Sequence, residues 1–240
     1  MFGDIMEKIS NLDKIKDVAV AFLNEDIEKT EYSPLIVIHP IFENGIQSVK
    51  KDGKFELVNI LEDEEGFDEI ISRYTKRIKN CANVYEVYSV IRKSYRLTFL
   101  KYIEKYLNLR DFSQLLSHAW VSSENPNQDV NVSLSTAVKW FKKSDKKILM
   151  SEEEYKYYES LPENLTVYRG VAVGRNPKGL SWTCNKDTAE WFANRFNRSG
   201  KKGYIQSANI DKTDVLAYFN SRDEDEVVVD TTNLINIKEV

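Results

Sequence analysis

The chain has 240 residues, of which 42% are hydrophobic and 12% aromatic. This is enough to build the core of one large domain or of two small ones. Its 34 Lys and Arg residues against 38 Asp and Glu residues give a formal net charge of −4. Because neutralisation of phosphates dominates the affinity for nucleic acid, this charge disfavours DNA or RNA as a partner. With two histidines and two cysteines outside any CxxC spacing, the sequence offers no ligand cluster, and we expect no metal.

The sequence shows no targeting or membrane-spanning segment. No apolar run approaches the ~20 residues that a membrane-spanning helix needs, and residues 1–17 carry charge in every turn, unlike a signal peptide. We therefore expect a cytoplasmic protein with no membrane partner. A composition rich in Lys, Glu, Asn, Ile and Tyr is compatible with a low-GC bacterium or its phage.

The first half of the chain predicts helices and a small hairpin. Residues 11–29 place apolar side chains on one helical face, and Asn11 is a suitable N-cap. Residues 35–39 are predicted to form a buried strand, and residues 55–60 a second strand after a Lys-Asp-Gly-Lys turn. Residues 66–107 predict two helices, of which the second is long and runs through residues 85–106 with an aromatic stripe that we assign to packing.

The clearest loop covers residues 121–133 and contains the turn sequence Asn125-Pro126-Asn127. It predicts a boundary between a mainly helical region, residues 1–130, and a second domain, residues 131–240. The loop could border a binding cleft or be a plain surface linker. After it, Ser133 is a predicted N-cap, and Ser151 with Glu154 forms the pattern of a capping box.

The second half has a sequence pattern typical of an α+β domain, with short strands and helices. Short strands are predicted at residues 165–169, 180–183, 204–210, 226–230 and 234–237, and residues 215–218 are compatible with a further short strand or with a turn. An amphipathic helix is predicted at residues 185–196.

Three short polar motifs stand among these strands. Arg169 ends a strand beside Gly170, Ser181-Trp182-Thr183 places two hydroxyls on one face of a strand, and Glu224-Asp225-Glu226 leads into an apolar strand. A guanidinium matches a diphosphate or a carboxylate, and a pair of carboxylates suits acid–base work or stabilisation of a cation. Each motif alone is also compatible with an ordinary structural role.

In this order, the motifs resemble the mono-ADP-ribosyltransferase family of the Arg-Ser-Glu type. The matching segments are residues 167–170, 181–183 and 224–227, with the helix around residues 189–193. The resemblance covers about residues 145–240. It implies a C-terminal core of two small, roughly perpendicular, antiparallel or mixed sheets around a cleft for NAD⁺, which serves as co-substrate.

The resemblance also implies residue roles. Glu226 would stabilise the cation that develops on the ribose, Arg169 would hold the diphosphate or the adjacent ribose, and Ser181 would position Glu226. Thr183 would reinforce the polar network, and Glu224 would orient or deprotonate the acceptor, with an arginine of a host protein as the first expectation. Further NAD⁺-binding candidates are Tyr168, Gly170, Trp182 and Phe192, although Trp182 and Phe192 could equally be core residues.

Other functions stay open at this stage. Water could replace the acceptor, which would make the protein an NAD⁺ glycohydrolase. The transferase reading is that of a toxin-like protein, whereas the fold could also serve as a non-catalytic binding protein, such as a phage-encoded inhibitor that blocks a host enzyme by contact. Residues 1–130 lie outside the resemblance, and a recognition module, an immunity-like cap and a scaffold are all compatible with them.

Overall fold

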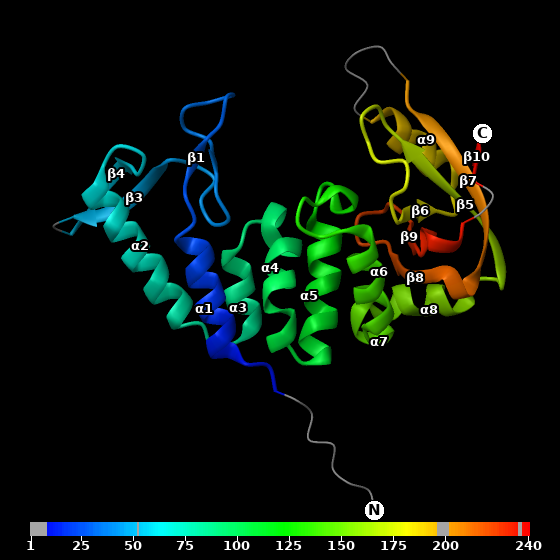
Figure 1. The fold of residues 1–240 in the computed structure, drawn as a ribbon, viewed down its shortest axis with the longest axis horizontal. Helices are drawn as coiled ribbons and strands as arrows, with labels where there is room; N and C mark the ends of the chain where they lie inside the picture. The colour runs from blue at the N-terminus through cyan, green and yellow to red at the C-terminus, as the bar shows by residue number, and fades with distance from the viewer. Residues whose placement is uncertain (1–8, 52, 196–201, 235–236) are drawn as a thin grey trace, which may run out of the picture. The chain divides into compact units, whose positions relative to one another are not determined.

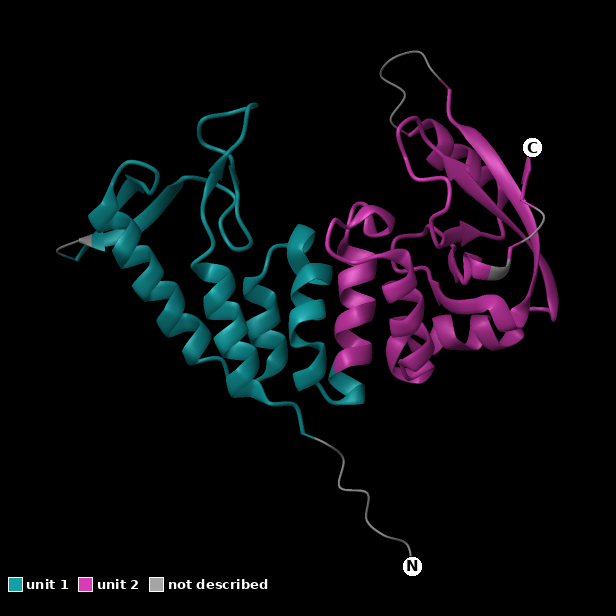
Figure 2. Ribbon diagram, viewed as in Figure 1, with its two compact units in different colours: residues 1–111 teal, residues 112–240 magenta. Residues whose placement is uncertain are grey.

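The computed structural model describes residues 9–51, 53–195, 202–234 and 237–240 (Figure 1). The chain divides into two compact units, residues 1–111 and 112–240 (Figure 2). The boundary therefore falls earlier than the expected position near residue 130. The reason is packing: the rings of Phe112 and Trp140 lie edge-to-face with centroids 6.0 Å apart, and those of Trp120 and Phe141 with centroids 5.0 Å apart. Residues 112–130 consequently belong to the second core.

Unit 1 combines helices with two small two-stranded sheets. Asn11 caps the first helix as predicted, since its side chain accepts a hydrogen bond from the Lys14 amide at 3.1 Å. The helical elements are α1 (Leu12–Leu23), α2 (Glu64–Lys79), α3 (Val84–Val90), η1 (Lys93–Tyr95), α4 (Arg96–Ile103) and η2 (Glu104–Tyr106). The strands are β1 (Glu28–Lys29), β2 (Val37–Ile38), β3 (Ile46–Lys51) and β4 (Lys54–Asn59).

The hairpin of unit 1 is built differently from the prediction. β4 pairs with β3, a strand that the sequence pattern did not indicate, and the turn between them uses Gly53 at φ +79°. The predicted buried strand at residues 35–39 is wrong: only Val37–Ile38 is a strand, and Ile38 is 47% exposed. Its apolar composition suggested burial, but the pairing with β1 turns this side chain outward.

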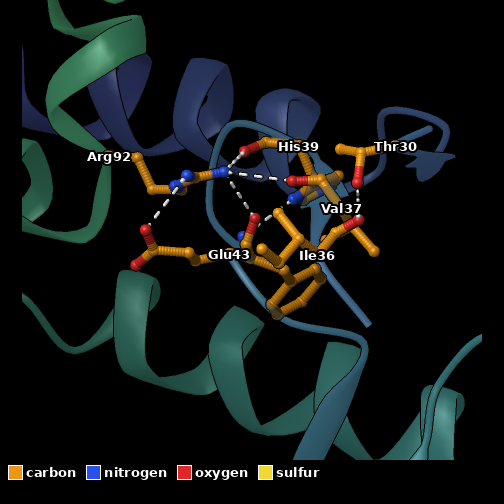
Figure 3. A network of polar contacts seen from close by, with 7 residues as sticks. Thr30, Ile36, Val37, His39, Glu43 and Arg92 are labelled. Carbon is orange, nitrogen blue, oxygen red and sulfur yellow. Dashed lines mark hydrogen bonds and ion pairs between the residues drawn. The ribbon is translucent and has the colours of Figure 1, made fainter. Parts of the chain in front are cut away.

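The predicted long helix at residues 85–106 is also wrong, because it breaks at Ile91 and Arg92, which are extended. The Arg92 side chain donates hydrogen bonds to the carbonyls of Val37, His39 and Phe42 at 3.0–3.3 Å (Figure 3). Its backbone amide donates to the Pro40 carbonyl at 2.9 Å. These bonds to a distant loop replace the helical ones, so tertiary contacts override the local helical pattern.

The buried side chain of His39 stabilises the same loop by accepting backbone hydrogen bonds. Its Nδ1 accepts hydrogen bonds from the amides of Ile41 and Phe42 at 3.1 and 3.0 Å. Burial lowers the pKa of His39 to about 4, so the ring is neutral near pH 7.

Unit 2 has helices and one sheet. Ser133 and Ser151 begin α6 and α8 as predicted, and Ser151 forms the full capping box with Glu154. The helical elements are α5 (Leu109–Ser122, which starts in unit 1), η3 (Pro126–Gln128), α6 (Leu134–Lys143), α7 (Lys146–Leu149), α8 (Glu152–Ser160), α9 (Lys186–Asn194), η4 (Lys212–Asp214) and η5 (Thr231–Asn233). The strands are β5 (Asn164–Val171), β6 (Ser181–Thr183), β7 (Tyr204–Asp211), β8 (Val215–Phe219), β9 (Glu226–Val229) and β10 (Lys238–Glu239).

Unit 2 has the expected α+β class, but its strands form one sheet where two small sheets were expected. Within the described residues, the strands form a six-stranded antiparallel sheet in the order β10-β7-β5-β6-β9-β8. Among the described residues, the strand pairing between its halves, β10-β7-β5 and β6-β9-β8, consists of the pair of Tyr168 with Thr183. The strand expected at residues 234–237 lies partly outside the described residues.

Helix α9 packs on β5, and Gly170 permits this close approach. A Cβ atom at Gly170 would stand 2.0 Å from the Ala189 carbonyl oxygen and 2.6 Å from the Ala193 amide nitrogen. Tyr168, Ala189, Ala193 and Ile205 form a small apolar cluster between helix and sheet. In the described parts of both units, no helix combines the length and the apolar character needed to cross a membrane.

Candidate active site

One pocket in unit 2 brings the sequence motifs together. It is lined by β5, β6 and β9, by the end of α5 and the loop that follows it, and by α9. With its mouth and the open solvent there included, it holds about 1030 Å³ of space between the atoms. All the candidate residues line it: Tyr168, Arg169, Gly170, Ser181, Trp182, Thr183, Phe192, Glu224 and Glu226.

The strand register explains how the hydroxyls meet the acid. Thr183 lies opposite Glu226 in the β6–β9 pair, and opposite residues share a face of an antiparallel sheet. Ser181 lies two residues before Thr183 and therefore also faces this side. Trp182 points the other way into the core, where it is 2% exposed and its indole N–H donates to the Gly179 carbonyl.

Glu226 sits in a protected part of the pocket wall. Trp120 donates its indole N–H to Oε1 of Glu226 at 2.9 Å. Burial raises the pKa of Glu226, and the hydrogen bonds from Ser181 and Trp120 oppose this rise. The charge of Glu224 raises the pKa further and that of Arg169 lowers it. The site thus holds a carboxylate whose ionisation depends on its neighbours.

A side-chain amide fixes Ser181. Nδ2 of Asn127 donates to the Ser181 hydroxyl at 2.8 Å, while Oδ1 of Asn127 accepts from the Leu180 amide at 2.6 Å. Asn127 is 9% exposed. The Asn125-Pro126-Asn127 loop therefore borders the pocket and is not a surface linker.

Arg169 is a buried organiser of the chain that precedes β6. Its Nη1 donates to the Ser181 carbonyl and its Nη2 to the Asn176 carbonyl at 2.9 Å. Its Nε is buried and has no hydrogen-bond partner among the described residues. Burial lowers the pKa of Arg169 to about 10, an effect that Glu226 and Tyr204 oppose, so the guanidinium stays charged near pH 7.

The four acidic residues at positions 223–226 differ in whether they line the pocket. Asp223 and Asp225 both adopt positive φ angles, and Asp225 accepts a hydrogen bond from the Tyr218 hydroxyl at 2.7 Å. Neither lines the pocket, whereas Glu224 and Glu226 both do. The structure thus separates the pocket carboxylates from the two aspartates beside them.

Glu224 lies between two arginines at the pocket. Its Oε1 is 3.3 Å from Nη2 of Arg222 and 3.9 Å from Nη1 of Arg195. Arg195 also stands 4.9 Å from the ring centroid of Trp191 and 3.9 Å from Glu124. Glu224 therefore already contacts guanidinium groups of its own chain.

The other candidates form the walls. The Thr183 hydroxyl accepts from the Asn185 amide at 3.1 Å and so fixes the turn into α9. Phe192 is partly exposed at the pocket, and Tyr168 packs against α9. Gly170 acts through the helix contact described above.

Sequence reasoning missed several pocket residues. They are Trp120, Glu124, Arg175, Arg195 and Arg222. The turn sequence around Asn127 was a usable signal, but nothing local marks Trp120, which reads as one more buried aromatic of a helix. Because four arginines line the pocket with Glu124, Glu224 and Glu226, its wall suits an anionic ligand and still offers carboxylates for a cation.

Comparisons of the chain with protein-family models, with curated proteins and with solved structures gave no match.

Proposed function

We propose that this protein cleaves NAD⁺ and transfers its ADP-ribose to a protein acceptor, with an arginine side chain as the nucleophile. One observation carries the proposal: Arg169, Ser181 and Glu226, from three separate strands, line a single pocket. Their order along the chain resembles the Arg-Ser-Glu type of mono-ADP-ribosyltransferase, and their meeting in space is what such chemistry requires.

The reaction breaks the bond between nicotinamide and ribose, which places positive charge on the ribose as in glycoside cleavage. The Glu226 carboxylate stabilises that charge. A carboxylate inside a protected pocket acts more strongly than one in water, because the effective dielectric is lower. Trp120 and Ser181 favour its ionised form.

The arginines support binding of the diphosphate. Arg169 holds the Ser181 and Asn176 carbonyls and keeps an unpartnered Nε–H, so its contribution combines positioning with charge. Arg175, Arg195 and Arg222 line the same pocket and add positive charge around it.

Glu224 binds the acceptor arginine and accepts its proton. Its contact with Arg222 is the kind of carboxylate–guanidinium pairing that an incoming arginine would make. A nitrogen of the acceptor forms a bond to C1′ of the ribose while nicotinamide leaves with the electron pair of the broken bond. The proton released from the guanidinium passes to Glu224.

A second candidate is hydrolysis of NAD⁺ by water. It is favoured by the contacts of Glu224 with Arg222 and Arg195, which an acceptor guanidinium must first displace. Water needs no such displacement.

The experiment is incubation of the protein with NAD⁺ labelled in the adenylate and with bacterial lysate. Wild type is compared with Glu226→Gln and with the control Glu153→Gln, a change at an exposed carboxylate on α8. Transfer predicts label on a discrete protein, lost only in Glu226→Gln. Free ADP-ribose without labelled protein indicates the hydrolase. Absence of both products contradicts NAD⁺ cleavage and leaves a non-catalytic binding protein.

A further inference from the structure

Two residues that precede the sheet converge on the acid of the site. Trp120 lies near the end of α5 and Asn127 in the short helix η3, both outside the segment that carries the three motifs. Each is at least nine-tenths buried, and each directs a side-chain N–H to the Ser181–Glu226 pair.

The orientation of the Asn127 amide is fixed by the backbone. The Leu180 N–H can only donate, so the atom of Asn127 that faces it at 2.6 Å must be the carbonyl oxygen Oδ1. The amide nitrogen must then face the Ser181 hydroxyl, which accepts from it at 2.8 Å. With its oxygen accepting from Asn127, the hydroxyl has its hydrogen available for Glu226.

Trp120 supplies the second donor. An indole N–H donates and never accepts, and it carries no charge that titrates. Trp120 is 1% exposed, and its ring is held edge-to-face against Phe141. The donor therefore points at Oε1 of Glu226 with little freedom to turn away.

We propose that Trp120 and Asn127 are positioning residues that hold Glu226 ionised and oriented, Trp120 directly and Asn127 through the Ser181 hydroxyl. This inference rests on the proposed NAD⁺ cleavage. It assigns to residues 112–133 a part in the site, because the strands alone leave Glu226 without the Trp120 donor and Ser181 without a fixed direction.

Some of the other groups around Glu226 favour its ionised form and some oppose it. Burial and the charge of Glu224 disfavour its ionisation, while Arg169 on β5 favours it. Arg222, in the loop before β9, and Arg195, just after α9, partly neutralise Glu224. Glu124 and Arg175 complete the charged lining of the pocket. None of these groups changes when Trp120 or Asn127 is substituted without adding charge, so a shift in pH dependence can be assigned to the lost donor.

The test is the pH profile of nicotinamide release by wild type, Trp120→Phe and Asn127→Ala. Trp120→Phe keeps an aromatic ring and removes the N–H. A hydrogen bond to a charged group is worth enough to move the acid limb up by about one pH unit. Asn127→Ala frees the Ser181 hydroxyl to turn, and we expect a smaller upward shift. Trp140→Phe, a change at another buried tryptophan that does not line the pocket, should leave the limb unmoved.

A folded fraction that is constant with pH scales the whole profile and leaves its midpoint unchanged, whereas acid unfolding of a weakened variant would move it. Each profile is therefore read only over the pH range in which circular dichroism shows the variant folded. If Trp120→Phe yields no soluble protein, Asn127→Ala, which adds no charge, carries the test.

An active wild type whose variants keep the wild-type limb would overturn the positioning role and leave the proposed reaction standing. A wild type that releases no nicotinamide overturns both.

Discussion

The guanidinium of Arg169 donates to the backbone carbonyl of Ser181, not to its side chain. The same guanidinium donates to the Asn176 carbonyl. One buried cation therefore holds both ends of the segment between residues 176 and 181 by hydrogen bonds. Gly179 lies so close that a Cβ atom there would stand 2.2 Å from Nη2 of Arg169. The position of the Ser181 hydroxyl in the pocket thus depends on the cation.

Arg169→Lys should disturb this segment, because a single ammonium does not reproduce the planar fork that reaches both carbonyls. We expect a loss of about 1–3 kcal/mol in the free energy of unfolding and weaker binding of NAD⁺. Urea denaturation and calorimetric titration with NAD⁺ measure the two effects. Arg175→Lys, at a half-buried pocket arginine, is the matched control. Equal losses in the two variants would contradict a special role of Arg169.

Gly170→Ala should destabilise unit 2 by about 3 kcal/mol, since its Cβ would collide with the backbone of α9 and overpacking of this kind is poorly relieved. Gly174→Ala is the control: nothing lies within 4 Å of its Cβ, and only its φ of +79° opposes the change. That strain costs about 1–2 kcal/mol. Thermal and urea unfolding compare the two, and a Gly170→Ala protein as stable as wild type would show that α9 can move away freely.

Glu224→Gln should separate transfer from cleavage. The side chain keeps its size but no longer accepts a proton, so we expect modification of the acceptor to fall by about 100-fold. Release of nicotinamide should fall much less, because Glu226 is intact. The ratio of labelled acceptor to free nicotinamide measures the effect. Asp223→Asn is the control, because Asp223 is exposed and Asn tolerates its positive φ. Parallel loss of both products would place Glu224 in the cleavage step itself.

Glu226→Gln should abolish NAD⁺ cleavage and yet stabilise the fold at neutral pH. Burial raises the pKa of Glu226 in the folded protein above its unfolded value, so the ionised form opposes folding at any pH above the folded pKa. As pH falls through the folded pKa towards the unfolded one, the side chain becomes protonated and this cost disappears. The advantage of Glu226→Gln in melting temperature should therefore be present at pH 7 and vanish near pH 4. A constant difference between pH 4 and pH 7 would contradict this account.

Local chemistry made much of unit 2 predictable. Ser133 and Ser151 cap helices through bonds that span three residues, so their neighbours in sequence are sufficient to reveal them. The strand positions of Arg169, Ser181 and Glu226 also follow from short patterns. The single sheet did not follow, because the described strand pairing between its halves consists of one residue pair, Tyr168 with Thr183, that no local pattern encodes.

Unit 1 shows the opposite case. The residues around Ile91 have a helical pattern, yet the bonds from Arg92 to a loop some fifty residues earlier break the helix. Likewise, Ile38 is apolar but exposed, because pairing with β1 decides which side of the strand faces out. Such contacts have energies comparable to helix or strand preferences and override them.

By itself, the amino-acid sequence determined the α+β class, the helix caps and the order of the arginine, serine and glutamate motifs, all of which depend on residues close together in the chain. Only the tertiary structure decided that Trp120 and Asn127 reach Glu226 and Ser181, which lie 106 and 54 residues further along. The physical reason is that a hydrogen bond depends on distance and direction in space, and the packing of α5 and η3 against the sheet sets both.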